Sequence, residues 1–320
     1  MTELGEPCGA LRLEDLEDPR PGPGQVLVRV RAAALNFPDV LLCRGTYQVK
    51  PPLPFTPGVE LCGEVAALGG EVTGVAVGAR VIGSPASGAF AELALMSAAG
   101  LLPAPDSLTD AQAAAFHLGY QTGWFALHRR AGLQPGETLL VHAAAGGVGS
   151  AAVQLGKAAG ARVIGVVGGP AKVKIAHRLG ADIVVDKHSA DFVPVVKEVT
   201  GGRGADVIYD PVGGDTYLRS TKCVAFEGRI LVIGFAGGQI PSVPLNHALI
   251  KNYSIVGLHW GRYQSVDPGL VRHCHDELSE MAAAGAVAPL VTERVGMNAL
   301  PGALQRLADG TTAGRAVLIP

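Results

Sequence analysis

Charged side chains are scarce in this chain of 320 residues: Asp, Glu, Lys and Arg make up 17% of it, and the formal net charge is −2. A nearly neutral chain lacks the basic surface that nucleic acid or an anionic membrane attracts, so we expect neither partner. Hydrophobic residues reach 48%, which excludes a disordered chain and, at this length, predicts two globular domains. Small-molecule partners fit this composition better.

The sequence also lacks clustered cysteines. Five are scattered along the chain without a Cys-x-x-Cys pair: Cys8, Cys43, Cys62, Cys223 and Cys274. This usage predicts a reducing compartment and thiols that act as small buried apolar groups. The N-terminal segment has no apolar stretch of the kind that forms a signal peptide, so we expect a cytoplasmic protein.

The most informative segment is Thr138–Gly149, TLLVHAAAGGVG, where an apolar run gives way to small residues and glycines before a helix-like stretch. This order predicts a strand, a tight turn and a helix. A helix N-terminus directs N–H groups at one point, and small residues let a pyrophosphate approach the backbone. Ala144 replaces the first glycine of the GxGxxG pattern. The residues predicted to hold the pyrophosphate are Gly146, Gly147, Val148 and Gly149.

A second apolar run, Arg162–Val167, ends at Gly168. Dinucleotide folds that select NAD usually carry Asp or Glu here, bound to the ribose 2′-hydroxyl. This chain has two glycines and a proline instead, followed by Lys172 and Lys174. A 2′-phosphate would meet cations, which predicts NADPH as the cofactor and Lys172 as its contact. The alternative is that both lysines lie on the solvated face of a helix.

Short apolar runs then alternate with helix-length intervals up to His259, which predicts a doubly wound parallel sheet. The expected strands are Ile183–Asp186, Ala205–Asp210, Arg229–Ile233 and Ser254–Leu258. Ligands bind at the carboxyl ends of such strands. The candidate cofactor contacts at these ends are Gly168, Lys187, Gly234, Phe235 and Leu258.

The first part of the chain has partly alternating runs separated by Gly and Pro, which predicts a twisted β-barrel. Its expected strands are Val26–Arg31, Val59–Leu68, Ala79–Ile82 and Ala89–Leu95. Helices are expected at Asp39–Leu42, Gln112–Arg129, Leu270–Ala284 and Leu300–Ala308. A final strand, Arg315–Ile319, is expected to return to the first domain.

Several segments together resemble a known family, the zinc-free quinone oxidoreductases (zeta-crystallin type) of the medium-chain dehydrogenase/reductase superfamily. They are Leu35–Tyr47, Leu53–Val65, Gly88–Leu95, His142–Ala161 and Ala313–Pro320. The resemblance implies an α/β protein with a GroES-like β-barrel domain (1–117 and 260–320) and a Rossmann domain with a doubly wound parallel sheet (118–259). It also implies NADPH and a homodimer.

Zinc relatives carry a Gly-His-Glu ligand motif where this chain reads Gly58–Val59–Glu60. A zinc site needs three or four protein ligands, and the chain has no cysteine cluster, so we expect no metal. His273–Cys274–His275 is a weaker candidate because residues two apart on a helix do not share a face.

The resemblance implies two catalytic residues, Asn36 and Tyr47. The Asn36 amide is expected to bind an acceptor carbonyl or the nicotinamide ribose, and the alternative is a helix cap, a role for which Asp39 competes. The Tyr47 phenol is expected to position the cofactor or donate a proton. Its alternative is packing between domains.

The resemblance also implies a substrate pocket lined by Leu41, Trp124, His259 and Trp260. Among these, His259 is a candidate proton donor, or simply part of the pocket wall. Lys187 and Arg315 are further cofactor candidates, and for Arg315 a surface position is the alternative. His142 is expected to be structural.

These features predict a metal-independent enzyme that transfers hydride from NADPH to quinones or α,β-unsaturated carbonyls. An enoyl-CoA reductase is an alternative, because LNFPDVL and HAAAGGVG also resemble enoyl reductase domains of polyketide synthases. Lys50, Arg262 and Arg272 would then be candidates for a basic rim. A third alternative, from another class, is a non-catalytic NADPH-binding protein.

Overall fold

The computed structural model describes residues 1–320 and divides into two compact units. The terminal unit comprises Met1–Leu118 and Ser279–Pro320, and the central unit comprises Gly119–Leu278. The predicted boundary at 259/260 therefore lies too early. Two indole hydrogen bonds fix the additional segment to the central unit, since Trp260 Nε1 donates to Gln121 (3.0 Å) and Trp124 Nε1 donates to Glu277 (2.7 Å).

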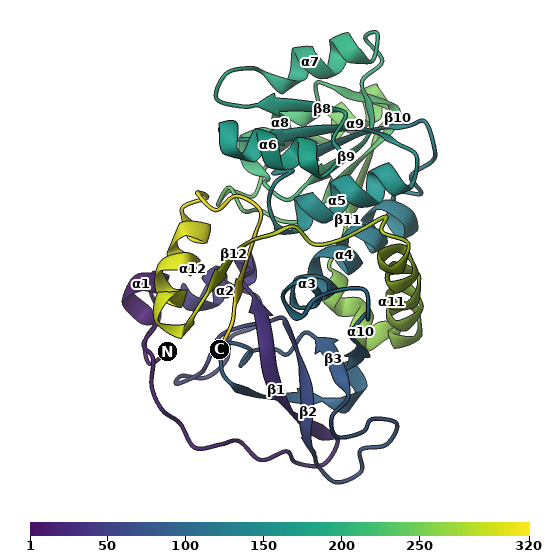
Figure 1. Ribbon diagram of the computed structural model, residues 1–320. Helices are drawn as coiled ribbons and strands as arrows, with labels where there is room; N and C mark the ends of the chain where they lie inside the picture. Colours follow the sequence, from purple (N-terminus) through teal and green to yellow (C-terminus); the bar gives the residue numbers. More distant parts are fainter. The chain divides into compact units, whose positions relative to one another are not determined.

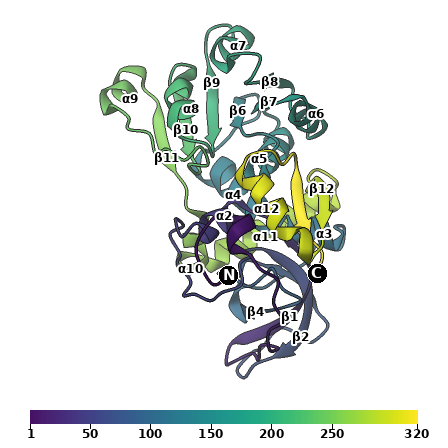
Figure 2. The same cartoon turned by 90° about the vertical axis from the view of Figure 1, so that its left-hand side faces the viewer.

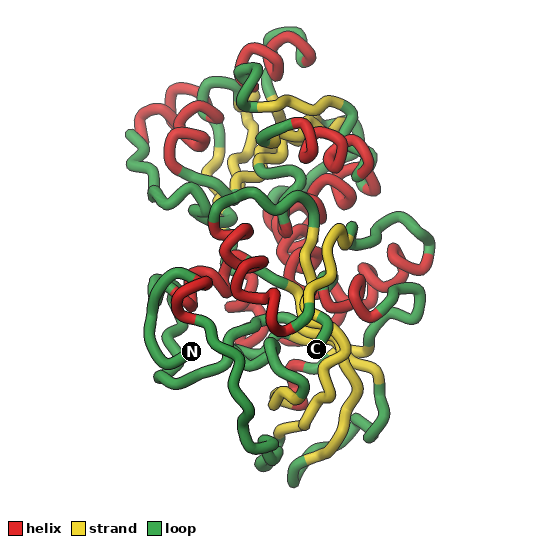
Figure 3. Tube along the Cα trace, turned by 60° about the vertical axis from the view of Figure 1, so that its left-hand side comes forward, coloured by secondary structure: helices red, strands yellow, loops and turns green.

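The terminal unit is built on one sheet of seven strands, shown in purple, blue and yellow in Figure 1. Its strands are β1 (Gln25–Ala34), β2 (Leu61–Leu68), β3 (Arg80–Gly83), β4 (Leu93–Ser97), β5 (Leu102–Pro103), β12 (Val291–Val295) and β13 (Arg315–Leu318). Its helices are α1 (Pro7–Ala10), α2 (Phe37–Cys43), α3 (Asp110–Ala114) and α12 (Leu300–Ala308), with short 3₁₀ turns η1 (Ala98–Gly100) and η4 (Met297–Ala299). Figure 3 shows these elements joined by long loops, in green.

The order of this sheet is β12-β13-β1-β2-β3-β5, and β4 also pairs with β1. Alternate residues of β1, Val26, Val28 and Val30, are buried in the core, as a strand with one face inward requires. Strand β13 pairs antiparallel with β1, which confirms the prediction that the C-terminal tail returns to the first part of the chain. The yellow helix α12 packs on α1 and α2 (Figure 1).

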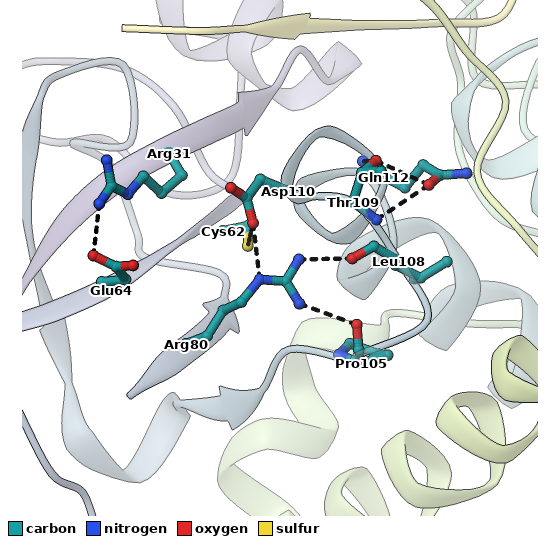
Figure 4. A network of polar contacts seen from close by, with 9 residues as sticks. All are labelled: Arg31, Cys62, Glu64, Arg80, Pro105, Leu108, Thr109, Asp110 and Gln112. Carbon is teal, nitrogen blue, oxygen red and sulfur yellow. Dashed lines mark hydrogen bonds and ion pairs between the residues drawn. The ribbon is translucent and has the colours of Figure 1, made fainter. Parts of the chain in front are cut away.

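A polar network fixes helix α3 to this sheet (Figure 4). Arg80 on β3 donates to the Asp110 carboxylate (2.8 Å) and to the carbonyl oxygens of Pro105 (3.1 Å) and Leu108 (2.7 Å). Thr109 and Gln112 cap the helix reciprocally. One planar guanidinium thus satisfies three acceptors at the turn that leads into α3.

The central unit carries a parallel sheet of six strands in the order β11-β10-β9-β6-β7-β8, which can be followed across Figure 2. The strands are β6 (Thr138–His142), β7 (Arg162–Val167), β8 (Ile183–Asp186), β9 (Ala205–Asp210), β10 (Val224–Val232) and β11 (Ser254–Gly257). The helices are α4 (His117–Trp124), α5 (Gly147–Ala158), α6 (Pro170–Arg178), α7 (Phe192–Val199), α8 (Gly214–Ser220), α9 (Leu245–Lys251), α10 (Tyr263–Val266) and α11 (Pro268–Ala283), with the π-helical turn η2 (Phe125–Arg130) and the 3₁₀ turn η3 (Trp260–Arg262).

The strand order reverses direction between β6 and β9, because the chain first builds outward through β7 and β8 and then returns to the other side of β6. Such a switch point opens a crevice at the carboxyl ends of the strands, where ligands of doubly wound folds bind. The predicted Rossmann-type sheet is therefore confirmed, and the glycine turn after β6 lies at its switch point.

One prediction fails at Gln112–Arg129, which is not a single helix. The chain breaks after α3 and restarts as α4, which continues into the π-helical turn η2. The Leu118 N–H in the first turn of α4 donates to Glu60 (2.8 Å), so a carboxylate far away in sequence caps the new helix. No helix in the structure is both long and apolar enough to span a membrane.

Candidate functional site

The glycine turn presents a helix N-terminus at the switch point. Gly146 precedes the first residue of α5, and a Cβ on Gly149 would lie 2.2 Å from the Ala143 carbonyl oxygen. The helix thus approaches the turn too closely for any side chain at Gly149. The last glycine of a dinucleotide fingerprint allows the same close approach. The half-buried Gly146, Gly147 and Val148 leave their side of the turn open, and N–H groups in a first helical turn lack helical acceptors. This geometry suits a phosphate.

Two lysines lie near the end of β7: Lys187, which follows β8, and Lys172 on α6. A Cβ on Gly168 would lie 3.0 Å from Lys187 Cε and 3.2 Å from the His188 ring. Partial burial and the positive charge of Lys187 both lower the pKa of Lys172 on α6. Ammonium groups close enough to repel each other favour an anion between them. The carboxylate of Asp186 is held by the backbone N–H groups of Gly169 (2.9 Å) and His188 (3.0 Å).

The ends of β10 and β11 contribute apolar groups at the same edge of the sheet. The Phe235 ring lies so close to Gly213 that a Cβ there would be 2.7 Å from it. Gly234 and Leu258 are half-buried, and Leu258 N–H donates to the Val232 carbonyl (3.1 Å). These positions contribute small and apolar groups at this edge of the sheet.

Among the predicted pocket residues of the central unit, His259 is exposed, whereas both tryptophans are buried. The Trp124 indole is bound to Glu277, which also contacts His273 on the same helix (3.1 Å). The Trp260 indole is bound to Gln121. Both indole N–H groups are therefore engaged in holding α11 and η3 on α4.

In the terminal unit the structure builds a buried cluster around Glu60. Its carboxylate accepts from Arg315 Nη2 (2.9 Å), from Asn36 Nδ2 (2.9 Å) and from Leu118 N–H. Arg315 Nη1 donates to Asn36 Oδ1 (3.0 Å). The side chain of Arg315 is 5% exposed and that of Glu60 is 0% exposed, so a surface position for Arg315 is wrong. Its guanidinium neutralises a carboxylate inside the unit.

Asn36 has a role in this cluster that neither expectation described. It is the N-cap of α2, but its backbone N–H donates to Asp39 Oδ2 (2.8 Å), while its side chain turns to the cluster. Both amide protons are used, one on Glu60 and one on the Ala34 carbonyl (3.2 Å). The free lone pair on Oδ1 can accept a hydrogen bond.

Burial changes the protonation of two carboxyl groups here. Desolvation raises the pKa of Asp39 to about 8, while the Asn36 N–H opposes the shift. Desolvation also raises the pKa of Glu60, and Arg315, Asn36 and Leu118 oppose that shift. The Glu60–Arg315 pair and a largely protonated Asp39 leave the cluster close to neutral at pH 7.

The predicted residues after α2 are half-buried. Leu41 lies on the helix, and Tyr47 follows the turn after it. Burial, and then the charge of Asp39, raise the pKa of Tyr47. A phenol with a raised pKa stays protonated at neutral pH and is suited to donating a hydrogen bond rather than to releasing its proton.

His142 is buried beside the turn and its Nε2 contacts Ser220 Oγ (2.8 Å). Because that hydroxyl already donates to the Thr216 carbonyl, it accepts from His142, which places the proton on Nε2. Desolvation lowers the pKa of His142 to about 3, so the ring is neutral. These contacts support the structural role expected for it.

No three His, Cys, Asp or Glu side chains gather where they would hold a metal ion, and Val59 is buried. Four of the five cysteines are buried free thiols, as expected, whereas Cys8 is exposed. The prediction that Asp39 competes for the cap of α2 is confirmed, since its carboxylate accepts from the Asn36 N–H, whereas the buried ion pair of Glu60 was not predicted. A single basic residue at the start of the otherwise apolar run Arg315–Ile319 was the available signal for a buried ion pair.

Residues 22–106 match the family profile described as "Alcohol dehydrogenase GroES-like domain", and residues 147–276 match the one described as "Zinc-binding dehydrogenase". The chain is 39% identical to the quinone oxidoreductase-like protein 2 homolog of Nematostella vectensis, over 99% of this chain and 87% of that protein. It is also 34% identical to a phenolphthiocerol/phthiocerol polyketide synthase subunit of Mycobacterium tuberculosis, over 97% of this chain but 14% of that protein.

Among solved structures, that of the Escherichia coli quinone oxidoreductase complexed with NADPH matches with a TM-score of 0.92 and 30% identity, covering 100% of this chain and 98% of that one. The GroES-like and Rossmann-type architecture extends along the whole chain. The chain belongs to the zinc-free quinone oxidoreductase family of the medium-chain dehydrogenase/reductase superfamily.

Proposed function

We propose that this chain is an NADPH-dependent reductase of quinones or α,β-unsaturated carbonyls that works without a metal ion. The observation that carries the proposal is Lys187 beside Gly168, with Lys172 close enough to be affected by its charge, at the strand end where an adenine ribose is bound in this fold. A 2′-phosphate placed there relieves the repulsion between two ammonium groups. The E. coli relative, whose structure contains NADPH, supports the choice of cofactor.

The residues present fit a dinucleotide. Gly149 lets α5 approach the turn, so the first N–H groups of the helix can face a pyrophosphate. Gly234, Phe235 and Leu258 supply small and apolar surface at the neighbouring strand ends. We assign Gly146, Gly147 and Val148 to the pyrophosphate, and Gly168, Lys172 and Lys187 to the 2′-phosphate.

The bound cofactor would supply the hydride, and the protein's task is to orient and polarise the acceptor. Tyr47 is proposed to donate a hydrogen bond from its protonated phenol, consistent with its raised pKa. Asn36 is proposed to accept a hydrogen bond at Oδ1, since its two amide protons are engaged. Leu41 and His259 are each proposed as substrate contacts. Arg315, Trp124 and Trp260 are proposed to act indirectly, through Glu60, Glu277 and Gln121, to which they are bound.

The test measures loss of reduced nicotinamide absorbance with NADPH or NADH against an ortho-quinone, a simple enone and an enoyl-CoA. Turnover with NADPH but not NADH supports the proposal. Lys172→Glu is expected to raise the KM for NADPH by about tenfold or more, since a charge-assisted bond contributes about 1.5–3 kcal/mol, and to spare NADH. Lys174→Glu, two residues on along α6 and exposed, is the matched control. An unchanged NADPH constant in Lys172→Glu contradicts the phosphate assignment.

A second candidate, enoyl-thioester reduction, is favoured by the similarity to a polyketide synthase subunit over 97% of the chain. The same parallel assay separates the two, because this candidate requires preference for the enoyl-CoA. Tight NADPH binding without turnover of any acceptor would indicate a non-catalytic binding protein.

We also propose a homodimer formed by the central unit. Strand β11 is an edge strand, and exposed apolar side chains lie near it in sequence: Ile240 (77% exposed), Leu245 (76%), Leu249 (77%) and Ile250 (70%). Such an edge and patch favour association with a second copy. Leu249→Asp is expected to halve the mass measured by sedimentation velocity, and Leu16→Asp, an exposed leucine of the terminal unit, is expected to leave it unchanged. A monomeric wild type would contradict this proposal.

A further inference from the structure

A cavity of about 300 Å³ lies in the central unit immediately after β11. It is lined by Arg130, Gly257, Leu258, His259, Arg262, Tyr263 and Val266. Two guanidinium groups and an imidazole thus contribute to one hollow, and none of its lining residues is acidic. At this volume the cavity is large enough for more than a single ion.

The two arginines of this cavity are available to a ligand. Arg130 and Arg262 are exposed, and neither forms an ion pair or a side-chain hydrogen bond with the protein. Arg229 of the same unit, by contrast, is bound to Glu137 through both Nη atoms (2.7 and 2.8 Å). A guanidinium without an internal carboxylate presents its fork of N–H donors to phosphate or carboxylate oxygens.

The walls that carry these arginines are held together. Arg130 ends the π-helical turn η2, and π-helical turns occur frequently at functional sites. At the start of the same turn the Phe125 ring packs on Tyr263, with ring centroids 4.3 Å apart. Trp260, between His259 and Arg262, is fixed by its bond to Gln121. The backbone positions that carry the two arginines are therefore fixed before a ligand binds.

We propose that this cavity binds an anionic group of the substrate, so that the enzyme prefers an anionic enone or enoyl thioester over a neutral acceptor with the same reactive carbon. The inference rests on the proposed reductase function and names its substrate class. The cavity begins at Leu258 and His259, at the carboxyl end of the last parallel strand, the edge where this fold binds ligands. The anion has two possible sources, the phosphates of a thioester carrier or a carboxylate on the enone itself.

The experiment compares substrates that share a reactive carbon but differ in charge. Crotonyl-CoA is compared with crotonyl-N-acetylcysteamine, and a carboxylated enone with its methyl ester, all at saturating NADPH so that the carrier's phosphates do not compete for the cofactor site. The variants are Arg130→Gln, Arg262→Gln and the double substitution. Arg129→Gln is the matched control, since Arg129 is an exposed neighbour that does not line the cavity.

Each cavity variant is expected to raise the KM for the preferred anionic substrate by about tenfold or more, as loss of a charge-assisted bond does, and to leave the KM of its neutral partner unchanged. If only crotonyl-CoA is preferred over its neutral partner, the bound anion is a carrier phosphate. If only the carboxylated enone is preferred over its methyl ester, the bound anion is the carboxylate of the enone. Equal use of charged and neutral partners by the wild type overturns the inference and leaves the reductase function standing.

If no acceptor is reduced, the proposed function fails, and the cavity is still tested by binding. Calorimetry with butyryl-CoA and butyryl-N-acetylcysteamine, at saturating NADP⁺, needs no turnover. Tighter binding of the CoA ester that is lost in the double variant supports an anion site. Equal binding in wild type, double variant and Arg129→Gln overturns it.

Discussion

The buried pair of Arg315 and Glu60 makes the sharpest prediction about stability. In Arg315→Met the Glu60 carboxylate keeps the Asn36 amide and the Leu118 N–H but loses its only cation. Removing one partner of a buried ion pair costs about 3–5 kcal/mol. For a unit of this size, that lowers the melting temperature by about 6–20 °C.

The pH dependence of this loss follows from the sign of the shift. Burial already raises the pKa of Glu60, and Arg315 opposes the shift, so its removal raises the pKa further. A carboxyl group with a raised folded-state pKa is stabilising when protonated and loses that contribution as pH rises through the folded pKa. The deficit of Arg315→Met is therefore expected to be largest near pH 8 and smaller near pH 5.

Urea unfolding followed by circular dichroism at both pH values measures this deficit. Both tryptophans, Trp124 and Trp260, lie in the central unit, so tryptophan fluorescence reports whether the loss is confined to the terminal unit. Glu60→Gln combined with Arg315→Met removes both members of the buried ion pair and is expected to recover more than half of the loss. A deficit below about 1 kcal/mol at pH 8, or a double variant as unstable as the single one, would refute the reasoning.

Three further predictions concern single positions. Gly149→Ala drives a Cβ against the Ala143 carbonyl and is expected to cost about 1–3 kcal/mol in urea unfolding, whereas Gly70→Ala, with open space around it, should cost less than about 0.5 kcal/mol. His142 is neutral in the fold, with a pKa lowered to about 3, so it makes the free energy of unfolding fall as the pH drops from 6.5 toward 3. His142→Gln should therefore flatten the pH dependence of the free energy of unfolding in acid by up to about 1.4 kcal/mol per pH unit. Parallel curves for variant and wild type would contradict this. Asp39, with a pKa raised to about 8, contributes stability that is lost as pH rises from about 4 through 8. The free energy of unfolding of Asp39→Asn should therefore rise relative to that of the wild type between pH 6 and 9. A constant difference between the two would refute this.

The strands of the central unit were predictable because their signals are local. β7, β8 and β9 begin and end at the predicted residues, since each is an apolar run closed by glycine or a polar residue. β12, with the sequence VTERV, was missed because it alternates with charged and polar residues and its burial is correspondingly partial. Its place in the sheet depends on pairing with β13, which no local pattern contains.

The break between α3 and α4 shows the same limit in a helix. The sequence from Gln112 onward has a continuous helical pattern, and the residue that caps the second helix, Glu60, lies 58 positions before Leu118. Arg315 is 255 positions from the same carboxylate. A charge within an apolar strand indicates that a partner exists, but only the fold identifies which acid it is.

Asn36 illustrates how much of a candidate site a sequence can give. Its position before a short helix supported two roles, a cap in which the side-chain oxygen accepts from the backbone and a ligand contact through the amide, and each treated the side chain as free to turn toward its partner. The fold removes that freedom, since Asp39 provides the cap and the amide protons go to Glu60 and Ala34. If the cluster stays intact when a ligand binds, Asn36 meets it as an acceptor, and a ligand hydroxyl suits it better than a carbonyl. Donor-like roles then pass to groups such as the Tyr47 phenol, whose raised pKa keeps its proton in place.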